Sequence, residues 1–407
     1  MLLVALACVP VQPGIKGGGG SSGGDTDAET VETAETADSA DSAEDTGNGD
    51  CGDIPPDEAG YTRFYDATQV HRIALTVSEA AMAELAAAPD DYVEADLVVD
   101  DLSMPSVGLK MRGDTAQQRW DGKPGFKIDL RKYDNCVPFA TIERILLDAG
   151  GDDPTQAREV VSAAVLEQLD LVAPRASFAT VTVNEEPFGL YTNIESIDDA
   201  FPPHHSTEPW TALWEGGDAA DFTDRGLADW SSVAGSEDPA ALAALSAVVL
   251  LAGDTFYTDA DALIDMDQLL RVWAALVVIG HANAYPYETG DVFLYAPKSD
   301  GRLRFIPWDL DEGWDTTFRW NAVEGSLGVR CVYDPTCEAA LRAHIETALT
   351  TSPDLVDIAS AAFSVSADAA ADDPRRGTTA GELQQARNAL LTTLNGWPQR
   401  IRAQLAE

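Results

Sequence analysis

The segment RFIPWDLDEGW, residues 304–314, decides the fold, because an apolar strand in it ends on two carboxylates, Asp309 and Asp311. Side chains two apart in an extended chain point to the same side, so we expect both carboxylates to face one way. A second apolar stretch, 292–295, lies upstream, and the turn-forming residues 297–301 join the two. This pattern predicts a β-hairpin that ends on an acidic pair.

Further polar positions precede the hairpin. His281-Ala282-Asn283 follows an apolar stretch, and Asp291 lies just before the first strand. A polar loop, a hairpin and then an acidic pair is also the order in which protein kinases present their catalytic loop, metal-binding asparagine and metal-binding aspartate. The order therefore indicates phosphoryl transfer as the first function to test.

The charge of the chain excludes one class of partner. The 407 residues include 69 acidic and 26 basic side chains, a formal net charge of -43, and 45% of the residues are hydrophobic. This length and apolar content suffice for one large core or two lobes. The negative charge repels nucleic acid, so we expect no nucleic-acid partner and a preference for cations or basic proteins.

The first eight residues, MLLVALAC, resemble the end of a bacterial lipoprotein signal with Cys8 as the lipidated residue. The usual positively charged start is missing, so we expect a truncated signal; an ordinary cleavable signal or a chance apolar start is the alternative. No later run is long and apolar enough to span a membrane. We expect a protein of the bacterial cell envelope or cell surface that contacts the membrane through a lipid anchor only, and a secreted protein if the anchor is absent.

Four further cysteines, an even number, favour disulfides over a metal site in an exported chain. Four cysteines allow three connectivities. Cys331 and Cys337 bracket a short loop, which favours their pairing and leaves Cys51 to pair with Cys136. These spacings match no zinc motif.

Composition divides the rest of the chain into a tether and a folded domain. Residues 9–58 are rich in Gly and then in Ala, Thr, Ser, Asp and Glu, which predicts a disordered acidic tether, with cation binding by the acidic run as the alternative. The folded domain covers 59–407, with a strand-rich lobe over 59–200 and a helical lobe over 201–407. We therefore expect an α+β, two-lobed architecture with a β-hairpin inserted among the helices.

Local patterns predict the individual elements. Alternation and short apolar runs predict strands at 73–77, 92–99, 107–112, 125–130, 177–183 and 189–194. Helical periodicity predicts helices at 78–88, 154–169, 238–251, 259–281, 336–349 and 381–405.

Basic residues are scarce in this chain, yet several cluster in KMRGDTAQQRWDGKPGFKIDL, residues 110–130. Arg112, Arg119, Lys123 and Lys127 could together neutralise a polyphosphate. Surface ion pairs with the many carboxylates are the alternative. By contrast, we expect His204 and His205 to face solvent in a loop, and Trp308, Trp314 and Trp320 to pack near the rim of the site.

Several blocks together resemble the CotH kinase family, which is named for spore coat protein H. They are the block 110–130, then DPTQAREVVSAAVLEQLDLVAPRASFATVTVNEEPFGLYTNIESID at 153–198, GHANAYPYETGDVFLY at 280–295, and RFIPWDLD at 304–311. The resemblance covers about residues 61–405. It implies an atypical protein-kinase-like fold that binds ATP and a divalent ion between its lobes and phosphorylates serines or threonines of other proteins; some relatives act as adhesins.

The resemblance also assigns roles by position. Arg112, Lys123 and Lys127 would face the ATP phosphates, and Glu159 would orient a lysine, as the helix glutamate of kinases does. Asp291, Asp309 and Asp311 would hold Mg²⁺, with Ca²⁺ or Mn²⁺ as alternative ions. Asp309 would also take part in catalysis. The acceptor would be an exported protein, basic or Ser-rich; the oligomeric state is not predicted.

One position departs from the family. Relatives commonly read GHWDGY, whereas this chain has Asn283 at the aspartate position and Asp291 where an asparagine is expected. An amide cannot accept a proton from a substrate hydroxyl, so Asn283 cannot be a general base. Because phosphoryl transfer depends mainly on positioning and charge neutralisation, activity need not be lost. A catalytically weak pseudokinase, a surface adhesion protein and a calcium-stabilised structural domain are the alternatives.

Overall fold

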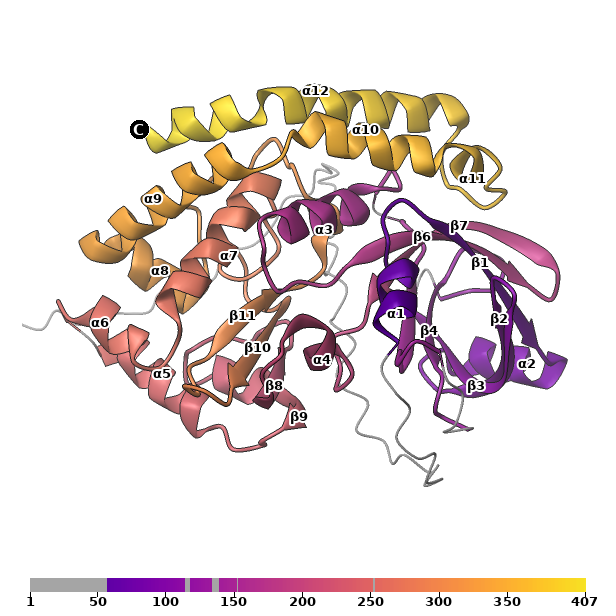
Figure 1. The fold of residues 1–407 in the computed structure, drawn as a ribbon, viewed down its shortest axis with the longest axis horizontal. Helices are drawn as coiled ribbons and strands as arrows, with labels where there is room; N and C mark the ends of the chain where they lie inside the picture. The colour runs from indigo at the N-terminus through magenta and orange to yellow at the C-terminus, as the bar shows by residue number, and fades with distance from the viewer. Residues whose placement is uncertain (1–56, 114–117, 134–138, 152, 252) are drawn as a thin grey trace, which may run out of the picture. The chain divides into compact units, whose positions relative to one another are not determined.

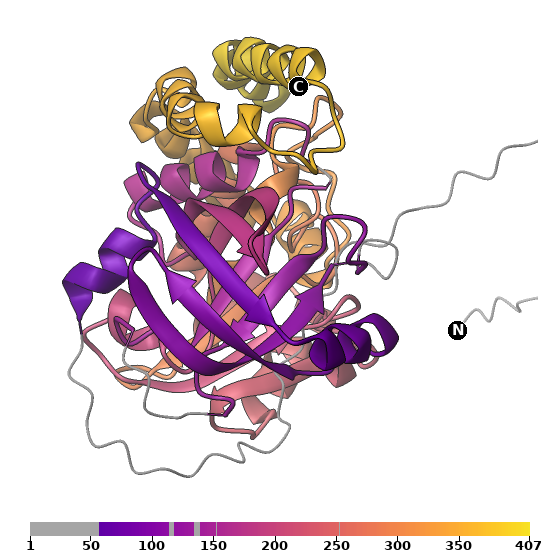
Figure 2. The ribbon, with the colours of Figure 1, turned by 90° about the vertical axis from the view of Figure 1, so that its right-hand side faces the viewer.

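Seven strands close into a barrel in the first part of the chain (Figure 1). The structure is a computed structural model that describes residues 57–113, 118–133, 139–151, 153–251 and 253–407. The strand order is β1-β2-β3-β4-β5-β7-β6, with β1 and β6 parallel and the other pairs antiparallel. The strands are β1 (Val70–Val77), β2 (Val93–Val99), β3 (Leu102–Arg112), β4 (Gly125–Asp129), β5 (Arg144–Asp148), β6 (Ala176–Val183) and β7 (Glu186–Glu195). Figure 2 looks onto this barrel.

Side chains along β3 and β4 alternate between the apolar interior of the barrel and its charged outer face. Leu109 and Met111 of β3 and Phe126 of β4 belong to the buried apolar core of the barrel. Their neighbours Lys110, Arg112 and Lys127 must point the other way, because successive strand residues face opposite sides. The outer face of β3 and β4 is therefore basic.

A second, antiparallel sheet follows, in the order β11-β10-β8-β9. Its strands are β8 (Trp210–Gly216), β9 (Trp230–Gly235), β10 (Val292–Pro297) and β11 (Arg304–Pro307). Leu146 and Ile194 from the outer barrel face share a buried apolar cluster with Ile306 and Trp308 at the end of this sheet. The basic outer face of the barrel therefore borders the end of the predicted hairpin.

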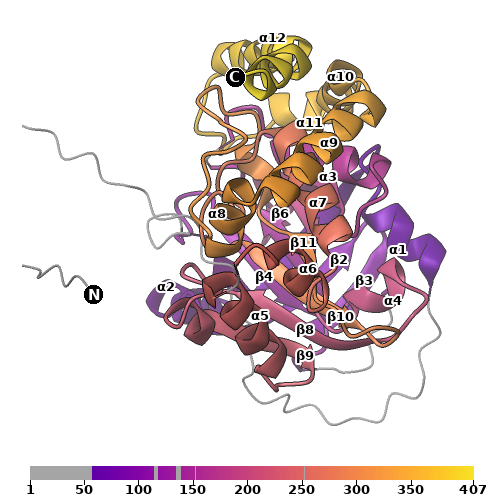
Figure 3. The same cartoon turned by 90° about the vertical axis from the view of Figure 1, so that its left-hand side faces the viewer.

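Helices supply the rest of the second core (Figures 1 and 3). Helix α7 (Met266–Ile279) has almost only buried apolar residues, begins at the N-cap Asp265 and ends at Gly280 in a left-handed conformation. It contacts α3 (Arg158–Gln168), α9 (Pro335–Thr351) and α12 (Ala380–Leu405). The other helices are α1 (Glu58–Phe64), α2 (Glu79–Ala87), α4 (Phe201–His205), α5 (Ala240–Leu251), α6 (Phe256–Asp261), α8 (Ser326–Tyr333), α10 (Leu355–Val365), α11 (Ala367–Ala371), and the short 3-10 helices η1 (Gly226–Asp229) and η2 (Leu310–Glu312). Within the described ranges, no helix combines the length and the apolar character needed to cross a membrane.

The mixed α+β class is confirmed, with strands concentrated before the helices. The hairpin of β10 and β11 and the disulfide between Cys331 and Cys337 are also confirmed. Cys8, Cys51 and Cys136 lie outside the described residues, as does the predicted tether except its last two positions.

Some local predictions are wrong. The single helix predicted over 259–281 is two helices, α6 and α7, because Ile264 forms a bridge with Leu303 and Asp265 caps a new helix start.

His204 and His205 do not face solvent. Their side chains are 2% and 8% exposed, and His205 Nε2 lies 2.7 Å from Glu195 Oε1, while the His204 ring stacks on Tyr61. The three tryptophans Trp308, Trp314 and Trp320 are buried, as expected.

Gly280 is a position where the fold requires glycine. Its φ is +60°, and a Cβ there would lie 2.1 Å from Cζ2 of Trp397 on α12. We expect Gly280→Ala to lower the free energy of unfolding by about 3 kcal/mol, combining left-handed strain with overpacking. The matched control Gly301→Ala, at φ +67° with open space around it, should lose only about 1 kcal/mol. Urea denaturation of both variants measures this, and equal losses would contradict the packing account.

Candidate functional site

The acidic pair lies beyond the end of the hairpin. Strand β11 ends at Pro307; Asp309 is left-handed, with φ +55°, and Asp311 sits in the 3-10 helix η2. The prediction that both carboxylates extend the strand is therefore wrong, although the charge of Asp309 still raises the pKa of Asp311. The chain turns because η2 packs against α3 and the Trp314 amide donates to the Ile279 carbonyl oxygen at 2.6 Å.

The turn brings Asp311 next to Glu159, which lies in the first turn of α3 and is 4% exposed. Burial raises the pKa of Glu159 well above its usual range, and the charges of Asp311 and Asp148 raise it further. The Leu310 backbone and Arg112 act in the opposite direction. Among the described residues, Glu159 Oε2 has no hydrogen-bond donor.

Asp311 experiences the same crowding. Burial raises its pKa well above the usual range, and Asp309 contributes the next largest effect, followed by Asp148. Several carboxylates this close cannot all be ionised without a compensating positive charge. The cluster formed by Asp148, Glu159, Asp309 and Asp311, which we call the acidic cluster, therefore has the chemistry of a cation site.

Helix α3 is fixed at its start by Asp153. Its carboxylate accepts hydrogen bonds from the amides of Ala157 and Arg158 at 2.7 and 2.8 Å, which satisfies donors at the helix N-terminus. Arg387 of α12 is buried and donates to the Thr155 carbonyl oxygen at 3.1 Å. The position of Glu159 therefore depends on a helix start held by both its own turn and α12.

The predicted phosphate-binding residues lie on the outer face of the barrel. Lys110 and Lys127 are directly opposite each other on β3 and β4, and each is 6% exposed. Like charges directly opposite each other destabilise a sheet. Arg112 Nη1 lies 3.7 Å from Asp148 Oδ2, which links the basic face to the acidic cluster. Arg119, by contrast, is exposed and pairs with Asp121.

Lys123 has a different environment from Lys127. Its ammonium nitrogen lies 2.8 Å from Asp373 Oδ2 and 2.5 Å from the Leu190 carbonyl oxygen. Burial lowers the pKa of Lys123, while Asp373 and, more weakly, Asp148 act to raise it. Sequence patterns did not identify Asp373, because it lies in no motif and 250 residues separate it from Lys123.

The loop from His281 to Asp291 passes beside the acidic pair. His281 is fully buried, and burial lowers its pKa to about 4 although the Trp308 and Asp309 backbone acts in the opposite direction. The imidazole is therefore neutral at physiological pH and cannot supply positive charge. Asn283 is partly exposed, and Asp291 is 7% exposed with φ +45° directly before β10.

The predicted metal ligands are not gathered as a set of three. In the described part of the chain, the acidic side chains whose oxygens all lie within 4.8 Å of one another are Glu143, Asp198 and Asp199. Arg131 pairs with Glu143, and Arg144 Nη1 lies 3.2 Å from Asp198 Oδ2. Burial and Asp199 raise the pKa of Glu143 to about 8. Each acidic group thus has arginine beside it, and each contains one buried carboxylate oxygen without a hydrogen-bond partner among the described residues, Asp198 Oδ2 in this group and Glu159 Oε2 in the acidic cluster. The set of Asp291, Asp309 and Asp311 stays a prediction.

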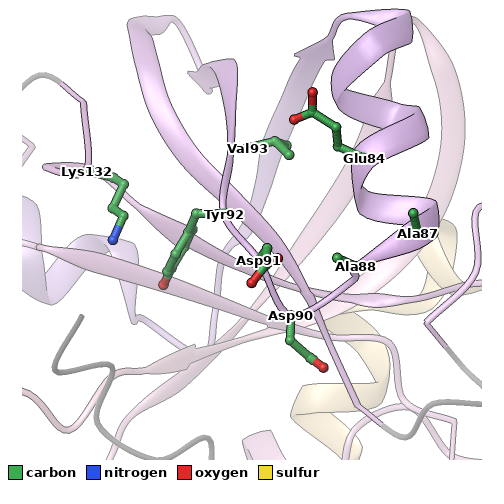
Figure 4. A pocket seen from close by; sticks show the side chains of 8 residues that line it. All are labelled: Glu84, Ala87, Ala88, Asp90, Asp91, Tyr92, Val93 and Lys132. Carbon is green, nitrogen blue, oxygen red and sulfur yellow. The ribbon is translucent and has the colours of Figure 1, made fainter. Parts of the chain in front are cut away.

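Two cavities lie away from these residues. One, of about 600 Å³, lies at the end of α2 and the start of β2, where Tyr92 and Lys132 stand across from Glu84 and Asp90 (Figure 4). The other, of about 620 Å³, is lined by residues of α1, β1 and the turn after β2. Neither is lined by a residue of the acidic cluster.

The pKa of Glu159 predicts a stability cost that depends on pH. Below about pH 4 the carboxyl is protonated in both the folded and unfolded chains. As pH rises, the unfolded chain releases the proton first, so stability falls towards neutral pH. We expect Glu159→Gln to be more stable than the wild type at pH 7 by about 1 kcal/mol or more, since one pKa unit corresponds to about 1.4 kcal/mol.

Urea denaturation at pH 4 and pH 7 checks this expectation. The gain should nearly vanish at pH 4, and Glu167→Gln, at an exposed position of the same helix, should show no gain at either pH. If Glu159→Gln raises the free energy of unfolding equally at both pH values, the stability cost does not come from ionisation of the buried Glu159 carboxyl.

The family model described as CotH kinase protein matches residues 109–345, more than half of the chain. Inner spore coat protein H of Bacillus subtilis (strain 168) is 23% identical over 188 residues, which cover 43% of this chain and 51% of that protein. The chain thus spans about half the length of this curated relative.

A solved structure, that of the Helicobacter pylori proinflammatory kinase CtkA, matches with 10% identity and a TM-score of 0.33, covering 68% of this chain and 90% of that one. The region matched by the family model includes the basic face, Glu159, Asp309 and Asp311. The chain belongs to the CotH kinase family.

Proposed function

We propose that this protein is a divalent-cation-dependent protein kinase that transfers the terminal phosphoryl group of ATP to a serine or threonine of an exported protein. The observation that carries the proposal is the acidic cluster beside a basic barrel face: buried Glu159 with an unmatched oxygen, Asp311 next to it, and Arg112 at the border. Membership of a kinase family implies the use of ATP.

Each side of the site has a separate task in this proposal. Lys127 and Arg112 on the outer barrel face would bind phosphate oxygens, Arg112 through its fork of donors. Asp309, Asp311 and Glu159 would supply carboxylate oxygens to Mg²⁺, with Mn²⁺ or Ca²⁺ as alternative ions, and Asp291 would join them when nucleotide binds. The bound ion would neutralise charge on the phosphates during transfer.

The raised pKa values of Asp311 and Glu159 suit this task. Carboxylates that repel one another in the absence of a cation gain most when one binds, and they release protons as it does. Tight packing of η2 on α3 keeps the ligands from separating to relieve the repulsion. The repulsion that lowers the stability of the ion-free protein would thus also raise its affinity for the ion.

Asp309 provides the sharpest test of the cation site. We expect Asp309→Ala to weaken binding of ATP with Mg²⁺ at least tenfold and to abolish phosphoryl transfer, because it removes a ligand. Asp315→Asn, at an exposed position a few residues further on, serves as the control and should bind as the wild type does. Isothermal titration calorimetry measures binding, and transfer of labelled phosphate to envelope proteins measures activity. If wild-type protein binds no nucleotide with Mg²⁺, the kinase proposal is wrong.

A second candidate function, a pseudokinase that acts as a surface-binding protein, is favoured by Asn283. An amide at the position of the kinase base cannot accept the proton of the acceptor hydroxyl. A pseudokinase would still bind nucleotide, and an adhesion protein that keeps only the fold would bind none.

Replacing Asn283 by aspartate tests whether the missing base only slows phosphoryl transfer or whether the protein has lost this activity. We expect Asn283→Asp to raise the transfer rate by about 100-fold, the lower range for a general base, with ATP affinity changed less than twofold. Single-turnover transfer and nucleotide titration measure the two quantities. A variant that binds ATP but transfers no more phosphate than the wild type would contradict the assignment of the base position to residue 283.

The exported acceptor and the lipid anchor remain parts of this proposal. Similarity to an inner spore coat protein supports a role in an envelope or coat structure. The excess of acidic residues supports a basic acceptor. Radiolabelling of envelope lipoproteins with palmitate tests the anchor at Cys8.

A further inference from the structure

The turn between α11 and α12 reaches into the barrel side of the site. Asp373, in this turn, has a side chain with no exposed surface, an unusual position for a carboxylate. Its Oδ2 accepts hydrogen bonds from Lys123 Nζ at 2.8 Å, the Leu190 amide at 3.1 Å and Gln156 Nε2 at 3.3 Å. Its Oδ1 accepts from the Arg375 amide at 2.8 Å. One carboxylate thus joins four segments of the chain.

The barrel is shaped to receive this carboxylate. Gly189 of β7 has φ +102°, and a Cβ there would lie 2.0 Å from Asp373 Oδ1. No side chain fits at this position while Asp373 is in place. The glycine therefore lets the α11–α12 turn approach the strand that also carries Leu190.

Arg375 of the same turn holds the loop that carries Lys123. Its guanidinium donates to the carbonyl oxygens of Trp120 and Gly122 at 2.7 and 2.5 Å, and it lies 3.5 Å from the centre of the Phe188 ring. The loop joins β3 and β4, the two strands of the basic face. Asp373 and Arg375 thus bind one loop at two places.

Lys123 keeps capacity for a further ligand. Its ammonium has three donors, of which the Leu190 carbonyl oxygen and Asp373 use two. In the described part of the chain, no acceptor takes the third. The ammonium also lies 4.9 Å from the centre of the Tyr191 ring and is influenced by Asp148 of the acidic cluster. A phosphate oxygen between Lys123 and the acidic cluster could accept a hydrogen bond from this third N–H.

Glu159 does not hold this lysine. The groups that act on its carboxyl are Asp311, Asp148, the Leu310 backbone and Arg112. The ion-pair partner of Lys123 is Asp373, in a turn beyond residue 345, where the match to the family model ends. The role expected of the helix glutamate is therefore filled by a different part of the chain.

We propose that Asp373 is a positioning residue for ATP, and that it acts by holding the Lys123 ammonium at the place where a phosphate oxygen binds. This inference rests on the proposed function and assigns one step of it to a residue outside the matched region. The C-terminal helices α11 and α12 then belong to the nucleotide site, although they carry none of its predicted ligands.

A double-mutant cycle tests this inference. Dissociation constants for ATP with Mg²⁺ are measured by calorimetry for the wild type, Asp373→Asn, Lys123→Met and the double variant. We expect at least a tenfold loss for each single variant and no further loss in the double variant, because Asp373 acts through Lys123. Asp372→Asn, at the exposed neighbouring position, is the matched control and should bind within twofold of the wild type.

Stability is measured on the same samples, because an unpaired buried lysine destabilises a protein. If Asp373→Asn does not fold, Asp373→Glu takes its place in the cycle: it keeps the charge but moves the carboxylate, and should still weaken ATP binding only when Lys123 is present. Equal losses with and without Lys123, or wild-type affinity in the Asp373 variants, would overturn the inference while leaving the kinase proposal intact. No binding of ATP by the wild type would overturn both.

Discussion

The repulsion between buried Glu159 and the partly exposed carboxylates around it, at the contact of η2 with α3, is the constraint on which the site depends. Glu159 and Asp311 are each pushed towards the protonated form by burial and by the other acidic residues. A fold under selection for stability alone would separate such groups or replace them. We propose that a cation binds there together with an anionic ligand, which accounts for these carboxylates at the end of the hairpin next to a basic strand face.

The surrounding fold holds the backbone on both sides of this group of carboxylates. The apolar helix α7 anchors the chain after η2 through the Ile279 carbonyl oxygen, and Asp153 and Arg387 hold the start of α3. On the barrel side, the turn at Asp373 fixes Lys123 and the neighbouring strand. Both charged faces are thus held by contacts between segments distant in sequence, which keeps ligand groups preorganised.

Local sequence patterns predicted many of the elements, although not β5, β8, β9, α8 or α10, and only part of the site. Short apolar runs and the turn residues between them predicted β10 and β11, and the apolar spacing of 154–169 predicted α3, because these depend on neighbours along the chain. The family blocks singled out Glu159, Asp309 and Asp311, which the structure brings together. The left-handed turn at Asp309 and the pairing of Lys123 with Asp373 were missed, because both are set by tertiary packing. The two histidines after Pro203 were misjudged for the same reason: their partners, Tyr61 and Glu195, come from other elements.

The position of a bound cation tests the central claim most directly. Crystals of the protein with Mn²⁺ and a non-hydrolysable ATP analogue would show the ion by its anomalous scattering. The account predicts an ion bound by oxygens of Asp309 and Asp311, with Glu159 in contact with it or with its water ligands, and with nucleotide phosphate on the side of Arg112. An ion held instead by Glu143, Asp198 and Asp199, or nucleotide bound with no ion at the acidic cluster, would contradict it.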